Sequence, residues 1–165
     1  MAVGLLLLPS VLTWPVSLKA QKMFIDAKIA AGYPLIPQLP YVVYPDRQVM
    51  DAIFWLRDNT DHEAVVLTAE TLGSMLPAYS GNTVYLGHGN QTVYFEQKMA
   101  LMKRFYQGLM TRQEMKDFLQ SNRLTYVFYG PEERQIGKLL PVDFLAPVFQ
   151  NDQTTIYQVL LPALK

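Results

Sequence analysis

The sequence predicts a three-layer, Rossmann-like α/β sandwich with a mostly parallel sheet and a C-terminal antiparallel hairpin. Between positions 46 and 140, short apolar runs alternate with amphipathic helical segments, which is the order of parallel strands joined by crossover helices. Such crossovers are right-handed and place helices on the faces of the sheet. After position 140, two further apolar runs are joined by a polar tip, as in a hairpin.

The folded domain is expected to begin at Asp46, which has a side chain suited to a helix N-cap. A helix follows with apolar residues along one face, and it ends near residues 59–62. The next segments are predicted as a short buried strand over residues 64–68, a crossover over residues 69–78, a turn over residues 79–82 and a second strand over residues 83–86.

The second half of the domain repeats this alternation. Residues 95–108 have apolar side chains at helical spacing and end in a glycine. Thr111 and Glu114 have the spacing of a capping box, which starts another helix. The remaining elements are a strand over residues 124–129, a helix with Pro131 at its first position, and a hairpin of residues 144–149 and 154–161 with a polar tip over residues 150–153.

Charge and composition exclude several classes of protein. The chain carries 14 basic and 14 acidic residues, so its formal net charge is zero, and it has no basic block to neutralise nucleic-acid phosphates. We therefore expect no nucleic-acid partner. The absence of cysteine excludes disulfides, thiolate metal sites and a cysteine nucleophile.

Residues 1–28 form a separate apolar segment that carries no charge before Lys19. Three interpretations compete: a secretory signal peptide, a buried core segment, and the end of a transmembrane helix that begins upstream of Met1. No basic residue precedes the apolar run, and Pro9 and Pro15 interrupt it, so we favour the third interpretation. The lipid bilayer is then a partner of this segment.

Residues 29–45 separate the apolar segment from the domain. A proline every few residues predicts an extended or polyproline-like linker and excludes a helix. Its tyrosines, Tyr33, Tyr41 and Tyr44, suit either a membrane interface or packing against the flank of the domain.

Polar residues follow each of the three predicted parallel strands. Because the carboxyl ends of parallel strands share one edge, we expect a cleft there in which helix N-termini and backbone donors face an anionic ligand. The alternative is that these residues only form turns and caps, with Arg134 paired to a neighbouring glutamate. The ligand-binding candidates are Glu70, Gly87, His88, Gly89, Asn90, Thr92, Glu132 and Arg134, and Thr68, Gly130 and Glu133 follow the same strands.

No motif in the chain identifies a reaction. Residues 87–92 lack the third glycine of a dinucleotide fingerprint and the Lys-Ser/Thr of a phosphate loop, and Ser80 is outside any Gly-x-Ser-x-Gly. His88 with Glu70 and Glu132 offers suitable metal ligands without ligand spacing, and His62 is expected to face solvent. The sequence therefore predicts no catalytic residue, no metal and no cofactor.

Several phrases between Asp46 and Val159 together resemble one family. Its most specific parts are Tyr79-Ser80-Gly81, Gly87-His88-Gly89 and Tyr129-Gly130-Pro131-Glu132, after an amphipathic helix that ends in Trp55-Leu56-Arg57. The series resembles the C-terminal soluble domain of bacterial polytopic membrane proteins related to the GT-C glycosyltransferases, the dolichyl-phosphate-mannose protein mannosyltransferase-like group.

This resemblance implies a domain without catalytic residues, because in that superfamily the acid that activates the acceptor lies in loops between membrane helices. The implied roles are to cover the membrane active site, to bind acceptor or lipid-linked sugar phosphate, or to hold a partner. We expect an extracytoplasmic location, although Lys19, Lys22 and Lys28 favour a cytoplasmic flank. The alternative is a free-standing α/β protein, either a ligand-binding module or a small hydrolase that uses His88.

Overall fold

The computed structural model describes residues 15–23, 26 and 46–161. The chain divides into two units, Met1–Pro40 and Tyr41–Lys165. In the first unit, residues 15–23 are helical and exposed. Within the ranges given above, no helix combines the length and the apolar character needed to cross a bilayer. The predicted linker over residues 29–45 and most of the predicted apolar segment over residues 1–28 lie outside the described residues.

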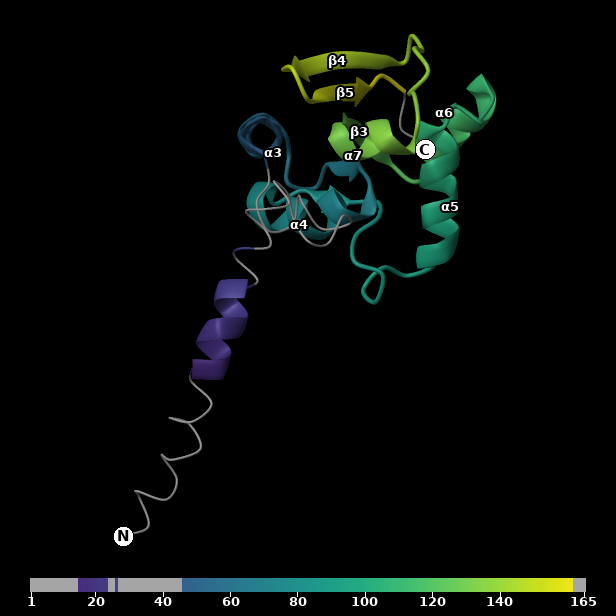
Figure 1. Cartoon of the computed structure of the whole chain (residues 1–165). Helices are drawn as coiled ribbons and strands as arrows, with labels where there is room; N and C mark the ends of the chain where they lie inside the picture. The colour runs from purple at the N-terminus through teal and green to yellow at the C-terminus, as the bar shows by residue number, and fades with distance from the viewer. Residues whose placement is uncertain (1–14, 24–25, 27–45, 162–165) are drawn as a thin grey trace. The chain divides into compact units, whose positions relative to one another are not determined.

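The second unit begins with a helix and then alternates strands and helices, as predicted (Figure 1). Its elements are α3 (Arg47–Asn59), β1 (Val65–Leu67), α4 (Glu70–Ser80), β2 (Thr83–Val84), α5 (Phe95–Tyr106), α6 (Arg112–Ser121), β3 (Leu124–Tyr129), α7 (Pro131–Ile136), β4 (Leu145–Gln150) and β5 (Thr155–Val159).

The five strands form one sheet in the order β2-β1-β3-β5-β4. β1 pairs in parallel with β2 and β3, whereas β5 pairs antiparallel with both β3 and β4. Four strands therefore run in one direction and only β5 runs in the other. The predicted fold class, a mostly parallel α/β sheet that ends in an antiparallel hairpin, is confirmed.

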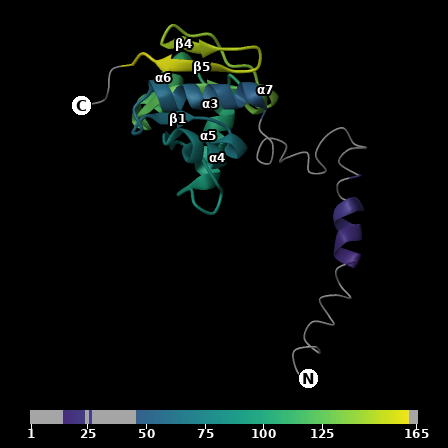
Figure 2. The same ribbon diagram turned by 90° about the vertical axis from the view of Figure 1, so that its left-hand side faces the viewer.

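Helices cover both faces of the sheet and give the domain two cores. One core joins α3 and α4 to Val66 and Phe128, and the other joins α5 and α6 to Leu67 and Val127. This division follows from the pleat, because successive strand residues point to opposite faces. Figure 1 shows α3 and α4 on one side of the strands and α5 and α6 on the other, and Figure 2 shows α3 lying across its face of the sheet.

The hydrogen bonds of two predicted helix N-caps are present in the structure. The carboxylate of Asp46 accepts a hydrogen bond from the Gln48 amide at 2.8 Å, at the N-terminus of α3. At the start of α6, Thr111 and Glu114 form the expected capping box, with side-chain oxygens accepting from each other's backbone N–H. Each cap satisfies amides that the first helical turn leaves without an internal partner.

The predicted turn over residues 79–82 is wrong at its start, because α4 continues through Pro77 to Ser80. The helix stops at Gly81, whose positive φ of 77° suits glycine and whose N–H donates to Pro77 O at 3.0 Å. The second strand is also shorter than predicted, since β2 comprises only Thr83–Val84. Beyond it, the chain passes so close to α4 that a Cβ on Gly73 would lie 2.0 Å from Leu86 O.

Candidate functional site

The buried carboxylate of Glu133 joins the carboxyl ends of the two central strands. Its Oε1 accepts hydrogen bonds from Thr68 Oγ1 at 2.8 Å and from the Ala69 amide at 2.7 Å, just after β1. Its Oε2 accepts from the Gly130 amide at 2.9 Å, just after β3. Glu133 is 0% exposed, and the three donors provide the partners that a buried carboxylate requires.

Glu132 lies on α7, and its side chain caps the N-terminus of the neighbouring helix α4. Its two carboxylate oxygens accept hydrogen bonds from the Thr71 and Leu72 amides, each at 3.1 Å. Both amides belong to the first turn of α4, where backbone N–H groups have no helical partner and a negative charge is favoured. Glu132 therefore occupies the place that an anionic ligand would take at this helix.

Tyr106 closes the same junction from the other face of the sheet. Its buried hydroxyl lies 3.0 Å from Leu67 O and 2.7 Å from Phe128 O, and it has one proton for these two carbonyls. The strand-end junction, by which we mean Glu132, Glu133 and Tyr106 with the backbone they bind, is thus satisfied largely by the chain itself.

Burial dominates the electrostatics of the strand-end junction. It raises the pKa of the Glu133 carboxyl above its ordinary value, against the opposing hydrogen bonds from Ala69 and Thr68. Burial likewise raises the pKa of Glu132, which lies beside Glu70. The pKa of the Tyr106 phenol is well above its ordinary value, first because of burial and then because of the two glutamates.

Little room for a ligand remains at the strand-end junction. The cavity beside the two glutamates has a volume of about 10 Å³, and its lining consists of Val49, Leu72, Phe128, Pro131, Glu132 and Glu133. That volume corresponds to about one water molecule.

Arg134 does not form the pair with a neighbouring glutamate that the alternative interpretation implied. Its guanidinium lies 5.1 Å from the centre of the Tyr129 ring, and the described part of the chain contains no ion pair from Arg134 to Glu132 or Glu133. Both glutamates are instead bound by backbone amides, which leaves Arg134 exposed on α7.

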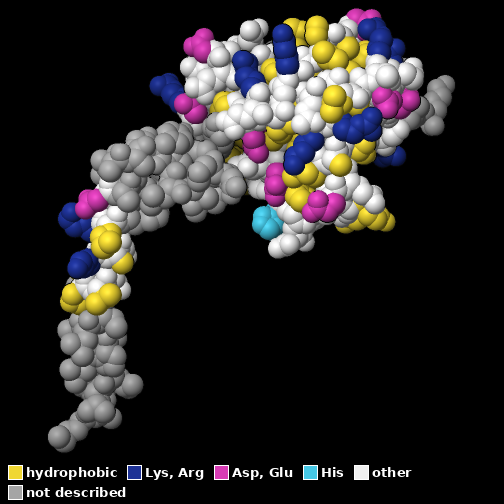
Figure 3. All heavy atoms as spheres, turned by 45° about the vertical axis from the view of Figure 1, so that its right-hand side comes forward, with side chains coloured by type: hydrophobic (Ala, Val, Ile, Leu, Met, Phe, Trp, Pro, Cys, Tyr) yellow, Lys and Arg dark blue, Asp and Glu magenta, His cyan; other side chains and the backbone are white. Residues whose placement is uncertain are grey.

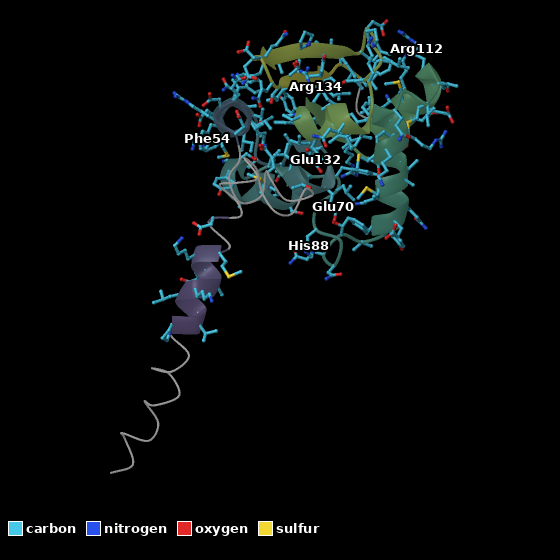
Figure 4. The ribbon with its side chains drawn as sticks, viewed as in Figure 1. Phe54, Glu70, His88, Arg112, Glu132 and Arg134 are labelled. Carbon is cyan, nitrogen blue, oxygen red and sulfur yellow. The ribbon has the colours of Figure 1, made fainter. Side chains whose placement is uncertain are left out.

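Residues 87–92 form a partly exposed turn held by its own hydrogen bonds. The Gly87 amide donates to Thr92 Oγ1 at 3.2 Å, and His88 O accepts from the amides of Gln91 and Thr92. His88 Nδ1 accepts a hydrogen bond from the Asn90 amide at 3.3 Å, and the His88 residue is exposed. Figure 4 places His88 out on this loop, with Glu70 between it and Glu132 in this view.

An open groove of about 650 Å³ lies between this loop, α4 and β2. Lys98 of α5 contributes its cation: the ammonium donates to Tyr85 O at 3.1 Å and lies 5.0 Å from the centre of the Tyr85 ring. No carboxylate is among the described residues of the lining, which are Gly73, Ser74, Pro77, Ala78, Asn82, Thr83, Val84, Tyr85, Gly87, His88, Gln91, Thr92, Val93 and Lys98.

The predicted ligand set is therefore distributed over three places. Gly87, His88 and Thr92 line the groove, with Gly89 and Asn90 on the same loop. Glu70 and Glu132 lie at the start of α4, and Arg134 lies on α7. Sequence reasoning missed Lys98 as a groove residue, because only the folded chain brings α5 next to β2.

The described residues form neither a metal-binding cluster nor a serine-hydrolase site. Residues 15–23, 26 and 46–161 contain no group of three or more carboxylates and imidazoles placed to hold a metal ion. Ser80 is buried in α4, and its hydroxyl donates to Leu76 O at 3.0 Å. His62 is exposed beside Gly81, as predicted.

No protein-family profile matches this sequence, and no curated protein matches it. A solved structure shares the fold: the C-terminal globular domain of an oligosaccharyltransferase from Archaeoglobus fulgidus. The two align with a TM-score of 0.51 and 12% sequence identity, over 69% of this chain and 97% of that one. The likeness is one of fold, and because that protein is archaeal it gives no support to a bacterial origin for this chain.

Proposed function

We propose that this chain is the C-terminal domain of a membrane glycosyltransferase-like protein, that it lies outside the cytoplasm, and that it binds substrate without performing the chemistry. The observation that carries the proposal is the shared fold: nearly the whole of the oligosaccharyltransferase C-terminal globular domain aligns with this chain. The predicted resemblance to the soluble domain of GT-C-related proteins supports the same assignment independently.

The groove beside residues 87–92 is the proposed binding surface. It is the larger opening next to the predicted ligand residues, and it presents Lys98 and His88 with no carboxylate in its described lining. An ammonium group and hydroxyl donors without a competing acid favour an anionic group. A lipid-linked sugar phosphate, or an acceptor that carries an anion, has this chemistry.

The test is a titration of the full chain with glucose 1-phosphate, followed through the backbone amide signals of residues 87–92. Saturable shifts that free glucose does not produce are the expected result, with weaker binding in His88→Ala and in Lys98→Gln. Arg134→Gln is the matched control, because Arg134 is exposed outside the groove. Equal responses to glucose and to its phosphate, or unchanged binding in both groove variants, would refute the proposed site.

The assignment to a membrane protein has its own test. Insertion of a short epitope after Asp152, an exposed residue at the tip between β4 and β5, provides the label for this test. In intact cells that express the complete gene, we expect a membrane-impermeant antibody to label this epitope. Labelling only after permeabilisation would contradict the extracytoplasmic location.

A further inference from the structure

β2 forms an open edge of the sheet. It is the terminal strand in the sheet order and pairs only with β1. Thr83 N donates to Ala64 O at 3.2 Å, and Tyr85 N donates to Val66 O at 3.0 Å. Because backbone groups alternate in direction along a strand, the N–H and C=O of Val84 face away from β1.

The groove follows this edge. Its lining includes every residue from Asn82 to Tyr85, and it continues to Gly87 and His88 beyond the end of β2. α4 contributes Ser74, Pro77 and Ala78, and the segment after the turn contributes Gln91 to Val93 and Lys98. The opening of about 650 Å³ therefore borders a strand whose outer backbone groups are unpaired by the sheet.

The chemistry of the groove favours a particular kind of strand. Lys98 donates one hydrogen bond to Tyr85 O, next to Val84, and an ammonium carries two more N–H groups. With His88 also in the lining and no carboxylate among the described lining residues, an acidic side chain has a complementary position there. By contrast, Figure 3 shows basic and acidic side chains interspersed over the view of the domain that it draws.

Exposed apolar side chains beside the groove would also gain from an occupant. Val93 in the lining and its neighbour Tyr94 are 68% and 72% exposed, and they offer apolar surface to a partner.

We propose that the open edge of β2 binds an extended segment of another polypeptide as an additional strand, with an acidic side chain of that segment held by Lys98. Strand addition is an established mode of peptide recognition, in which main-chain hydrogen bonds supply affinity and flanking pockets supply specificity. The proposal goes beyond the sugar-phosphate site, because its distinguishing contact is the backbone of Val84.

The probe is a short capped peptide of alternating Thr and Val with one central Glu, titrated into the isotope-labelled full chain. Saturation with a dissociation constant below about 1 mM is expected, together with slowed hydrogen exchange at the Val84 amide. The same peptide with Gln in place of Glu should bind about fivefold more weakly, as expected for a partly exposed ion pair.

N-methylation of the peptide decides between strand addition and other modes of binding. Methyl groups on alternate residues block one hydrogen-bonding edge of the peptide, so methylation in one register should abolish binding and methylation in the other should not. Equal effects in both registers, or no saturable binding, would overturn the proposal. The same hydrogen-exchange experiment without peptide tests for self-association. If exchange at the Val84 amide then slows as the protein concentration rises, the occupant is a second copy of this chain, and this result too would overturn the proposal.

Variants of the protein give a second, independent test of strand addition at β2. Val84→Pro removes the outward N–H and no bond to β1, and proline is tolerated at such edge positions, so we expect loss of peptide binding. Lys98→Gln should lower peptide affinity about fivefold, whereas Lys103→Gln, exposed on the same helix outside the groove, should not. If Val84→Pro does not fold, the methylated peptides still decide the question.

Discussion

The strand-end junction and the groove beside β2 both present hydrogen-bond donors that suit an anion. At the junction the chain's own carboxylates bind these donors, whereas in the groove no carboxylate of the described lining does so. At the strand-end junction, the amides of Ala69 and Gly130 and the first turn of α4 are bound by the carboxylates of Glu132 and Glu133. In the groove, Lys98 and His88 have no carboxylate beside them in the described lining. The first region is closed by groups of the chain itself, and the second is open.

This difference shows that converging backbone donors do not by themselves make a ligand site. An anion at the start of α4 would have to displace Glu132 from two amides, and beside β1 it would have to displace a fully buried Glu133. The groove requires no such displacement. The strand-end junction therefore fixes the position of the elements, and the groove is where binding can be tested.

The largest expected effect comes from Glu133→Ala. It leaves the Thr68 hydroxyl and the Ala69 and Gly130 amides without their partner, so we expect a loss of about 3–5 kcal/mol in the free energy of unfolding. Chemical denaturation measures it. Gln135→Ala, at an exposed position on the same helix, is the control, and a similar small loss in both variants would contradict the role given to Glu133.

Gly73→Ala tests the close contact between α4 and the segment after β2. The new Cβ would lie 2.0 Å from Leu86 O, so we expect a loss of about 2–3 kcal/mol despite the better helix propensity of alanine. Gly89→Ala is the matched control, because its Cβ would meet only the Phe95 ring at 3.5 Å. A neutral or stabilising Gly73→Ala would show that the loop moves away easily.

The pH dependence of stability follows from the raised pKa of Glu133. Because the folded state holds this proton more tightly than the unfolded state does, the contribution is fully present below the ordinary glutamate pKa and is lost as pH rises through the folded value. We therefore expect the stability of the wild type relative to Glu133→Gln to fall as pH rises above the ordinary glutamate pKa of about 4.3. A difference that stays constant as pH rises would contradict the effect of burial.

His88→Ala should have the smallest effect on stability, within about 0.5 kcal/mol, because the side chain is exposed and only its Nδ1 is hydrogen-bonded. Glucose 1-phosphate binding should nevertheless weaken, and this contrast separates the open groove from the closed strand-end junction. Thermal unfolding and titration of the same sample measure both quantities. A large loss of stability would assign His88 a structural role.

Where the signal was local, the sequence predicted the fold well. Asp46 and the pair Thr111 and Glu114 reach amides only two or three residues away, so their caps could be read directly. The predicted end of α4 failed because Pro77 and the residues after it have the composition of a turn, although the helix tolerates the proline and ends at Gly81. The contact between Gly73 and Leu86 that shapes the chain after β2 leaves no local signal.

By itself, the sequence determined the α/β class, the order of most elements and the candidate residues, because alternating apolar patterns and caps depend on near neighbours. Only the tertiary structure decided which of those candidates are free. Thr68 and Glu133 bond across 65 residues, and Lys98 reaches Tyr85 from another element. Such pairings depend on strand order and helix packing, and they determine that the strand-end junction is filled and that the edge of β2 is open.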